Sequence, residues 1–92
     1  MMEGKYRAGA LVSEVLKKEG VQYLFGIPGG HIYPTMERCE ELGIPFIGVR
    51  HEMTAAFAAE GWALATGKMG VCTGTAGPGV TNLLTGLANA YV

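Results

Sequence analysis

Three short apolar runs, each followed directly by a helical pattern, constrain the fold of this 92-residue chain more than any other feature. The runs predict strands over residues 21–26, 44–49 and 70–75. A helix precedes the first run, and this order predicts an α/β fold with a parallel sheet and helices on both faces. Because ligands of such sheets bind beyond the carboxyl ends of the strands, the residues after each strand form the candidate site.

The first two helices are expected over residues 8–19 and 31–42. The first has Lys17 and Lys18 in its last turn and ends at Gly20. The second tolerates a proline only in its first turn. Residues at helical spacing along the first helix are Ala8, Leu11, Val12, Val15, Leu16 and Glu19, and all but Glu19 are apolar.

The third helix is expected over residues 52–66 and the fourth after a turn at Gly77-Pro78-Gly79. The third is apolar nearly all round, which predicts burial by more than one neighbour. The fourth has one apolar stripe opposite a small and polar face. The stripe consists of Val80, Leu83, Leu84, Leu87, Ala88 and Tyr91. The other face consists of Thr81, Asn82, Thr85, Gly86 and Asn89.

Glycine is the outlier of the composition, with 15 of 92 residues, about twice its average share. The glycines cluster where the predicted strands end, as in Gly29-Gly30 and Gly77-Pro78-Gly79. Glycine in such places indicates a sharply turning backbone or a close approach to a ligand, although each loop alone also fits an ordinary tight turn.

Charge and cysteine content exclude several classes of protein. The net charge is -1 and no lysine or arginine cluster occurs, so we expect neither nucleic acid nor an anionic membrane as a partner. The charged first 20 residues are neither a signal peptide nor a membrane span. Cys39 and Cys72 lie 33 residues apart without metal-ligand spacing, which indicates a reducing cytoplasm and no metal site in this chain.

Glu52 is the candidate catalytic residue, because it lies between an apolar strand and an alanine-rich helix. A carboxylate that loses solvation there costs several kcal/mol unless something compensates. We therefore interpret Glu52 as an acid/base group facing a cofactor. The alternative is a first-turn glutamate, which the helix dipole favours. His31 and His51 also fit structural or exposed roles, His51 as a residue at the helix start.

A nucleotide-binding domain is the rival interpretation. Its hallmark is an acidic residue about 20 positions after the glycine loop, and Glu52 lies 22 residues after Gly30. The glycine spacing, however, is G-x-x-G-G in the first loop and G-x-x-G-x-G in the later one, not G-x-G-x-x-G. Pro28 also removes a donor where phosphate oxygens need one.

Three blocks together resemble the N-terminal pyrimidine-binding domain of thiamine diphosphate-dependent enzymes, most closely the branch with acetolactate synthase and pyruvate oxidase. They are F-G-I-P-G-G within residues 21–30, R-H-E-x-x-A-x-x-A-A-E-G-W-A within residues 50–65, and T-A-G-P-G-V-T-N within residues 70–91. The blocks cover nearly the whole chain in the family's order. Each block alone is weak, whereas the combination is specific.

The resemblance implies that Glu52 hydrogen-bonds a pyrimidine nitrogen of thiamine diphosphate. This favours the imino tautomer that deprotonates the thiazolium carbon, and the resulting ylid attacks a 2-keto acid, which is decarboxylated and used for carboligation. The resemblance also implies that two loops border the aminopyrimidine. Their expected cofactor-binding residues are Pro28, Gly29, Gly30, Thr75, Pro78, Gly79 and Asn82.

His31 departs from the acetolactate synthase pattern, which has a small residue after the paired glycines. Benzaldehyde lyase-like relatives carry a histidine in a similar G-x-H-I setting. The resemblance therefore leaves open a lyase or carboligase in which His31 shuttles a proton.

Length is the second departure from the family. The middle domain and the diphosphate-binding domain with its G-D-G…N signature, which holds magnesium, are absent from residues 1–92, so we expect a fragment, a split subunit or a truncated chain. The family site forms between two chains, and a three-stranded sheet has edges that need cover, so we expect a homo-oligomer or a partner chain carrying the diphosphate-binding domain. The 92 residues alone are expected to be inactive, a non-catalytic assembly fragment stays an alternative, and a requirement for FAD stays open.

Overall fold

The computed structural model describes residues 8–92, which form three strands, four α-helices and one short 3-10 helix. In chain order these are α2 (Ala8–Lys18), β1 (Leu24–Gly26), η1 (Gly30–Ile32), α3 (Tyr33–Glu41), β2 (Phe46–Gly48), α4 (Glu52–Thr66), β3 (Val71–Thr73) and α5 (Pro78–Tyr91). The predicted order of helices and strands is confirmed.

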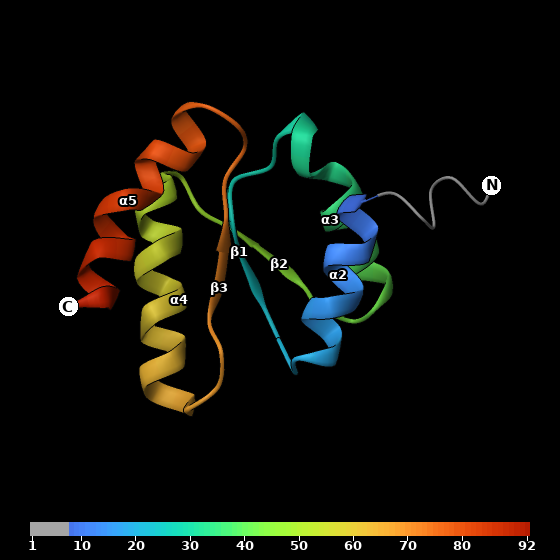
Figure 1. Ribbon diagram of the computed structural model, residues 1–92, viewed down its shortest axis with the longest axis horizontal. Coiled ribbons are helices and arrows are strands. Elements are labelled where there is room, and N and C mark those ends of the chain that lie inside the picture. The colour runs from blue at the N-terminus through green and yellow to red at the C-terminus, as the bar shows by residue number, and fades with distance from the viewer. Residues whose placement is uncertain (1–7) are drawn as a thin grey trace.

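The strands form one parallel sheet in the order β2-β1-β3. Phe25 in the central strand is in register with Ile47 and Cys72 on either side. Helices α2 and α3 cover one face of the sheet, and α4 and α5 cover the other (Figure 1). The predicted parallel α/β fold is therefore confirmed, with all three strands ending at the same edge.

The alternation of side chains along the sheet divides the interior into two cores. Leu24 joins the core under α2 and α3, together with Val21, Cys39 and Ile44. Phe25, next along the strand, packs on the other face against a core made of Ala55, Ala56 and Leu83. Large aliphatic side chains thus fill one core, while alanines form most of the other.

Several predicted boundaries differ from the structure. Each strand is three residues long, shorter than predicted. The second helix begins as the 3-10 turn η1, with Pro34 in the first turn of α3 as expected. The predicted turn at residues 77–79 is wrong in part, because Pro78 is already the first residue of α5. A proline suits that position, where its missing N–H has no helical partner anyway.

The apolar stripes predicted for the first and last helices are largely exposed, which corrects the expected packing. In α2 the buried residues are Ala10 and Ser13, while Leu11, Val12 and Val15 are at least half exposed. In α5 the stripe is exposed at Val80, Leu84, Leu87 and Tyr91. Small residues let each helix approach its neighbour closely, and Leu83 is the one member of the α5 stripe that is buried. The buried residues of α5 are Gly79, Leu83 and Gly86.

Helix α4 packs against β1, β3 and α5, which supports its predicted contact with more than one neighbour. The expected burial all round is wrong, because Phe57 and Leu64 are exposed, Leu64 to 80%. None of the helices within residues 8–92 is both long enough and apolar enough to cross a bilayer.

Candidate functional site at the carboxyl edge of the sheet

The loops that follow β1 and β3 touch each other at the carboxyl edge. The Nδ1 atom of His31 lies 3.2 Å from the hydroxyl oxygen of Thr75. A Cβ atom added to Gly29 would lie 2.6 Å from the Cβ of Thr75, so only glycine permits this approach. The structure therefore brings the loop that contains Gly29 and His31 against Thr75, which lies 44 positions after His31 in the sequence.

The loop after β3 leads tightly into α5. Gly77 caps the helix with a φ of 81°, a backbone conformation that favours glycine. A Cβ on Gly74 would lie 2.8 Å from the carbonyl oxygen of Gly79, so the backbone of the loop lies against the first turn of α5. The methyl group of Thr75 lies on the same glycine, 3.3 Å from the position of its absent Cβ.

Glu52 is the first residue of α4, directly after the end of the second strand–helix connection. The preceding residue, His51, caps the helix through Nδ1, which accepts a hydrogen bond from the backbone N–H of Met53 at 3.0 Å. The structural interpretation of His51 is thereby confirmed. The cap fixes where α4 begins and so places Glu52 at the carboxyl edge.

Asn82 is the side chain that holds Glu52. Its Nδ2 atom donates a hydrogen bond of 3.1 Å to Oε1 of Glu52. This bond and the backbone N–H of Glu52 lower the pKa of the Glu52 carboxyl, while partial burial opposes them. Glu52 is partly exposed to solvent within residues 8–92, so the expected desolvation of this carboxylate stays a prediction. A carboxylate in this setting stays ionised without an ion pair.

These contacts connect most of the predicted site residues in one path along the edge. His31 touches Thr75, Thr75 touches Gly79, and Asn82 lies one helical turn beyond Gly79 beside Glu52. Pro28 and Gly30 are exposed in the first loop. A Cβ on Gly30 would meet nothing within 4 Å, so its cofactor role stays a prediction.

Gly86 and the pair Glu60–Asn89 are features that the sequence analysis missed. A Cβ on Gly86 would lie 2.3 Å from the Cβ of Ala56, so the absence of a side chain at this glycine lets α5 approach α4 closely. Asn89 donates a hydrogen bond of 2.7 Å to Oε1 of Glu60. A glycine inside a helix costs about 1 kcal/mol of helix stability relative to alanine, so its presence usually has a packing reason. Gly86 within the predicted fourth helix was therefore the sequence signal for a close helix contact.

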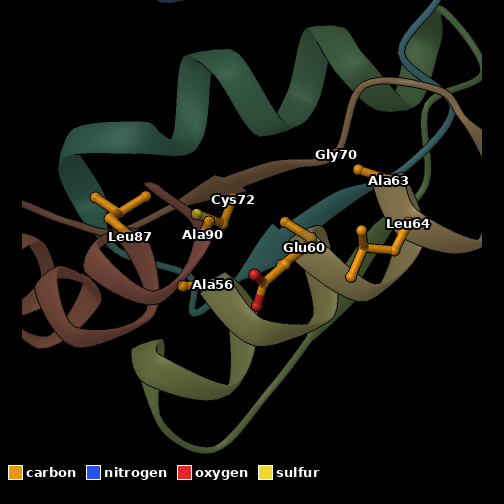
Figure 2. Close-up of a pocket in the computed structure, with 9 residues that line it drawn as sticks. Ala56, Glu60, Ala63, Leu64, Gly70, Cys72, Leu87 and Ala90 are labelled. Atoms are coloured by element: carbon orange, nitrogen blue, oxygen red, sulfur yellow. The ribbon is translucent and has the colours of Figure 1, made fainter. Parts of the chain in front are cut away.

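A groove of about 280 Å³ lies between α4, β3 and α5, away from the contact path at the edge. Figure 2 shows Ala56, Glu60 and Leu64 from α4 along it, with Leu87 and Ala90 from α5 and Cys72 from β3. Burial raises the pKa of the Cys72 thiol. A second hollow of about 380 Å³ lies near Gly43 and Phe46, on the far side of β1.

Comparison with known proteins assigns the family. Residues 6–92 match the family described as thiamine pyrophosphate enzyme, N-terminal TPP binding domain. This chain belongs to that family. It is a thiamine diphosphate-binding domain, as the resemblance of its three blocks predicted.

Relatives named for two different activities are about equally similar to this thiamine pyrophosphate enzyme domain. It is 54% identical over 81 residues to acetolactate synthase of Arthrospira platensis, covering 84% of this chain and 14% of the relative. Isozyme 2 of the acetolactate synthase large subunit of Escherichia coli is 51% identical over 81 residues, covering 88% and 15%. The enzyme 2-hydroxyacyl-CoA lyase 2 of Bos taurus is 50% identical over 84 residues, covering 91% and 13%. The chain therefore spans about one seventh of the length of these relatives.

The described residues fit the pyrimidine end of thiamine diphosphate. Glu52 is partly exposed, and no described side chain other than Asn82 hydrogen-bonds to it, so it is open to a ring nitrogen. Gly30 has free space beside its Cα atom, where a flat ring could lie against the backbone. Residues 8–92 contain no group of three His, Cys, Asp or Glu side chains arranged to bind a metal ion.

Proposed function

We propose that this chain is the N-terminal part of the pyrimidine-binding domain of an enzyme that decarboxylates 2-keto acids and performs carboligation, as in an acetolactate synthase-like reaction. The observation that supports this most is the position of Glu52. It begins α4 at the carboxyl edge, accepts a hydrogen bond from Asn82, and is partly exposed to solvent. This is where a parallel sheet binds its ligands.

Glu52 would bind a ring nitrogen of the pyrimidine and hold the proton there. The first loop, with Pro28, Gly29 and Gly30, and the stretch 75–82 would border the ring with backbone groups. When bound, thiamine diphosphate would supply a carbon that becomes nucleophilic on losing its proton and an electron sink for the charge left by decarboxylation. The protein would hold one ionised carboxylate in the position that the reaction requires relative to the bound cofactor.

The rest of the site would come from a diphosphate-binding domain, in the same polypeptide or in a partner chain. Domains of this family typically assemble with such a domain, and the chain spans only 13% to 15% of the relatives compared above. We propose that this assembly is at least dimeric and that magnesium belongs to the diphosphate-binding domain. The metal and FAD content of the purified natural-length protein tests these assignments.

A lyase is the second candidate, and His31 is the observation that favours it. The imidazole is exposed and hydrogen-bonded to Thr75 at the same edge as Glu52, so a proton could pass there. The similarity to 2-hydroxyacyl-CoA lyase 2 is close to that of the acetolactate synthases. In this proposal His31 shuttles a proton for bond cleavage or carboligation.

Binding and turnover of the natural-length protein test both candidates. We expect calorimetry to show binding of thiamine diphosphate with magnesium, weakened in Glu52→Gln. Consumption of a 2-keto acid with carbon dioxide release would support the synthase, whereas cleavage of a 2-hydroxyacyl-CoA would support the lyase. His31→Ala should slow the lyase reaction while cofactor binding stays nearly intact. No binding by the wild type would overturn the proposed function.

A further inference from the structure

Helices α4 and α5 run in the same direction and meet at three matched levels. Glu52 faces Asn82 at the carboxyl edge, Ala56 faces Gly86 in the middle, and Glu60 faces Asn89 beyond. Glu52, Ala56 and Glu60 are spaced by four residues, which places them on one face of α4. In Figure 2 Ala56 and Glu60 lie along this face.

The middle level sets the distance between the helices. Because Gly86 has no Cβ atom, α5 lies so close to α4 that an added Cβ would be 2.3 Å from that of Ala56. Asparagine has a short side chain, and only helices this close let it reach a glutamate across the interface. The contact at Gly86 thus makes the hydrogen bonds at Asn82 and Asn89 possible.

Both Glu–Asn pairs consist of an asparagine amide that donates a hydrogen bond to a glutamate carboxylate, but they lie at different positions along α4. Glu60 lies in the middle of α4, whereas Glu52 is its first residue, at the edge where a ligand binds. A partly exposed glutamate at a helix start has free rotamers, and fixing them on ligand binding would cost conformational entropy. The bond from Asn82 occupies Oε1 and leaves the other carboxylate oxygen for a ligand.

We propose that Asn82 is a positioning residue that fixes the Glu52 carboxylate for the cofactor, and that Gly86 provides the close helix spacing this requires. The proposal rests on the proposed function of Glu52. It changes the expected role of Asn82, which acts on the cofactor through Glu52. The pair Asn89–Glu60 lies two turns further along, away from the carboxyl edge, and serves as the matched comparison.

The electrostatic surroundings of Glu52 make this role measurable. The hydrogen bond from Asn82 is the largest cause of the lowered pKa of Glu52. Helix α5 carries no lysine, arginine, aspartate or glutamate, and β1 has no titratable side chain. Strand β3 has Cys72, and His51 precedes Glu52 in the chain. Loss of Asn82 should therefore raise the pKa of Glu52.

The test compares Asn82→Ala with the matched control Asn89→Ala in the natural-length protein. Infrared titration of the cofactor-free protein, with Glu52→Gln subtracted to isolate the band, reports the pKa of Glu52. We expect Asn82→Ala to raise this pKa and Asn82→Asp to raise it further, because a second carboxylate would face the first. Asn89→Ala should leave the pKa unchanged.

A second readout follows deuterium exchange at the thiazolium carbon of bound thiamine diphosphate. Asn82→Ala should slow exchange about 10- to 100-fold, as expected when a catalytic group is displaced by about 1 Å. The acid limb of its pH profile should move to higher pH, whereas Asn89→Ala should change neither the rate nor the profile. Equal effects of both variants, or no effect of Asn82→Ala on the pKa, would overturn the proposal. Since the infrared titration needs no cofactor, it decides the role of Asn82 even if the proposed function fails.

Discussion

The two helical layers on this sheet are held together in different ways. Helices α2 and α3 cover a core of large side chains and are joined by an Arg38–Glu14 ion pair and by hydroxyl bonds, such as that from Ser13 to the carbonyl oxygen of Thr35 at 2.7 Å. Helices α4 and α5 cover a core of alanines and are joined by two Glu–Asn bonds around a glycine contact. We expect the first layer to contribute more to stability, whereas the second places polar groups at the carboxyl edge.

The largest expected loss of stability comes from a substitution in the core under α2 and α3, and it tests whether that layer acts independently of the ligand edge. Ile44 is fully buried in the core under α2 and α3, so Ile44→Ala should lower the free energy of unfolding by about 2–5 kcal/mol. Urea unfolding measures this loss, with Val15→Ala on the exposed surface of α2 as the control. The pKa of Glu52 should not change in the variant. A change in that pKa would show that the layers are not independent.

A smaller loss of stability is expected in the other layer. Gly86→Ala places a methyl group against Ala56 and should cost about 1–3 kcal/mol, because the interface is overpacked. In contrast to Ile44→Ala, it should also raise the pKa of Glu52 by moving Asn82 away. The double variant with Ala56→Gly should recover part of both losses. Full independence of the two substitutions in this double-mutant cycle would contradict close packing as the cause.

Acid sensitivity tests the second layer further. The pKa of Glu52 is lowered from its ordinary value of 4.5 by Asn82 and by its own backbone N–H. The folded state therefore binds this proton less readily than the unfolded chain. Glu52 stabilises the protein above pH 4.5, and this contribution is lost as the pH falls through the lowered pKa. The free energies of unfolding of the wild type and Glu52→Gln, measured as a function of pH, should converge in acid. A difference that stays constant with pH would contradict a lowered pKa of Glu52 in the folded state.

The smallest expected effect belongs to the ion pair of the first layer. Arg38 donates two hydrogen bonds, of 3.0 Å and 2.6 Å, to Oε2 of Glu14, and both side chains keep contact with solvent. Arg38→Met retains the apolar stem and removes the charge, so it should destabilise only slightly. The loss should shrink at about 1 M salt, where charges are screened within about 3 Å. A loss independent of salt would show that packing of the stem dominates.

Periodicity and loop composition predicted the fold because each strand–helix unit is marked locally. The apolar run after Glu52 predicted the bounds of α4, and the glycine loops marked the strand ends. The parallel order then brings these ends to one edge without further information. The family motifs identify thiamine diphosphate as the cofactor, which the residue pattern alone does not specify.

The packing of α2 and α5 could not be predicted from hydrophobic spacing. Spacing assigns the most apolar face to the interior, but both helices pack through small residues because these allow close approach. The positions of Ser13 and Gly86 carry this information only in three dimensions, once Thr35 and Ala56 lie opposite. The bond between Glu52 and Asn82 depends on the same helix spacing, so neither residue alone reveals it.

The most direct test of the central claim is deuterium exchange at the thiazolium carbon of thiamine diphosphate bound to the natural-length protein with magnesium. The account predicts exchange well above that of free cofactor in the wild type and a loss of about 10²- to 10⁴-fold in Glu52→Gln, as expected when a general acid/base group is removed. Exchange in the wild type no faster than in free cofactor, or exchange unchanged by Glu52→Gln, would contradict the role of Glu52.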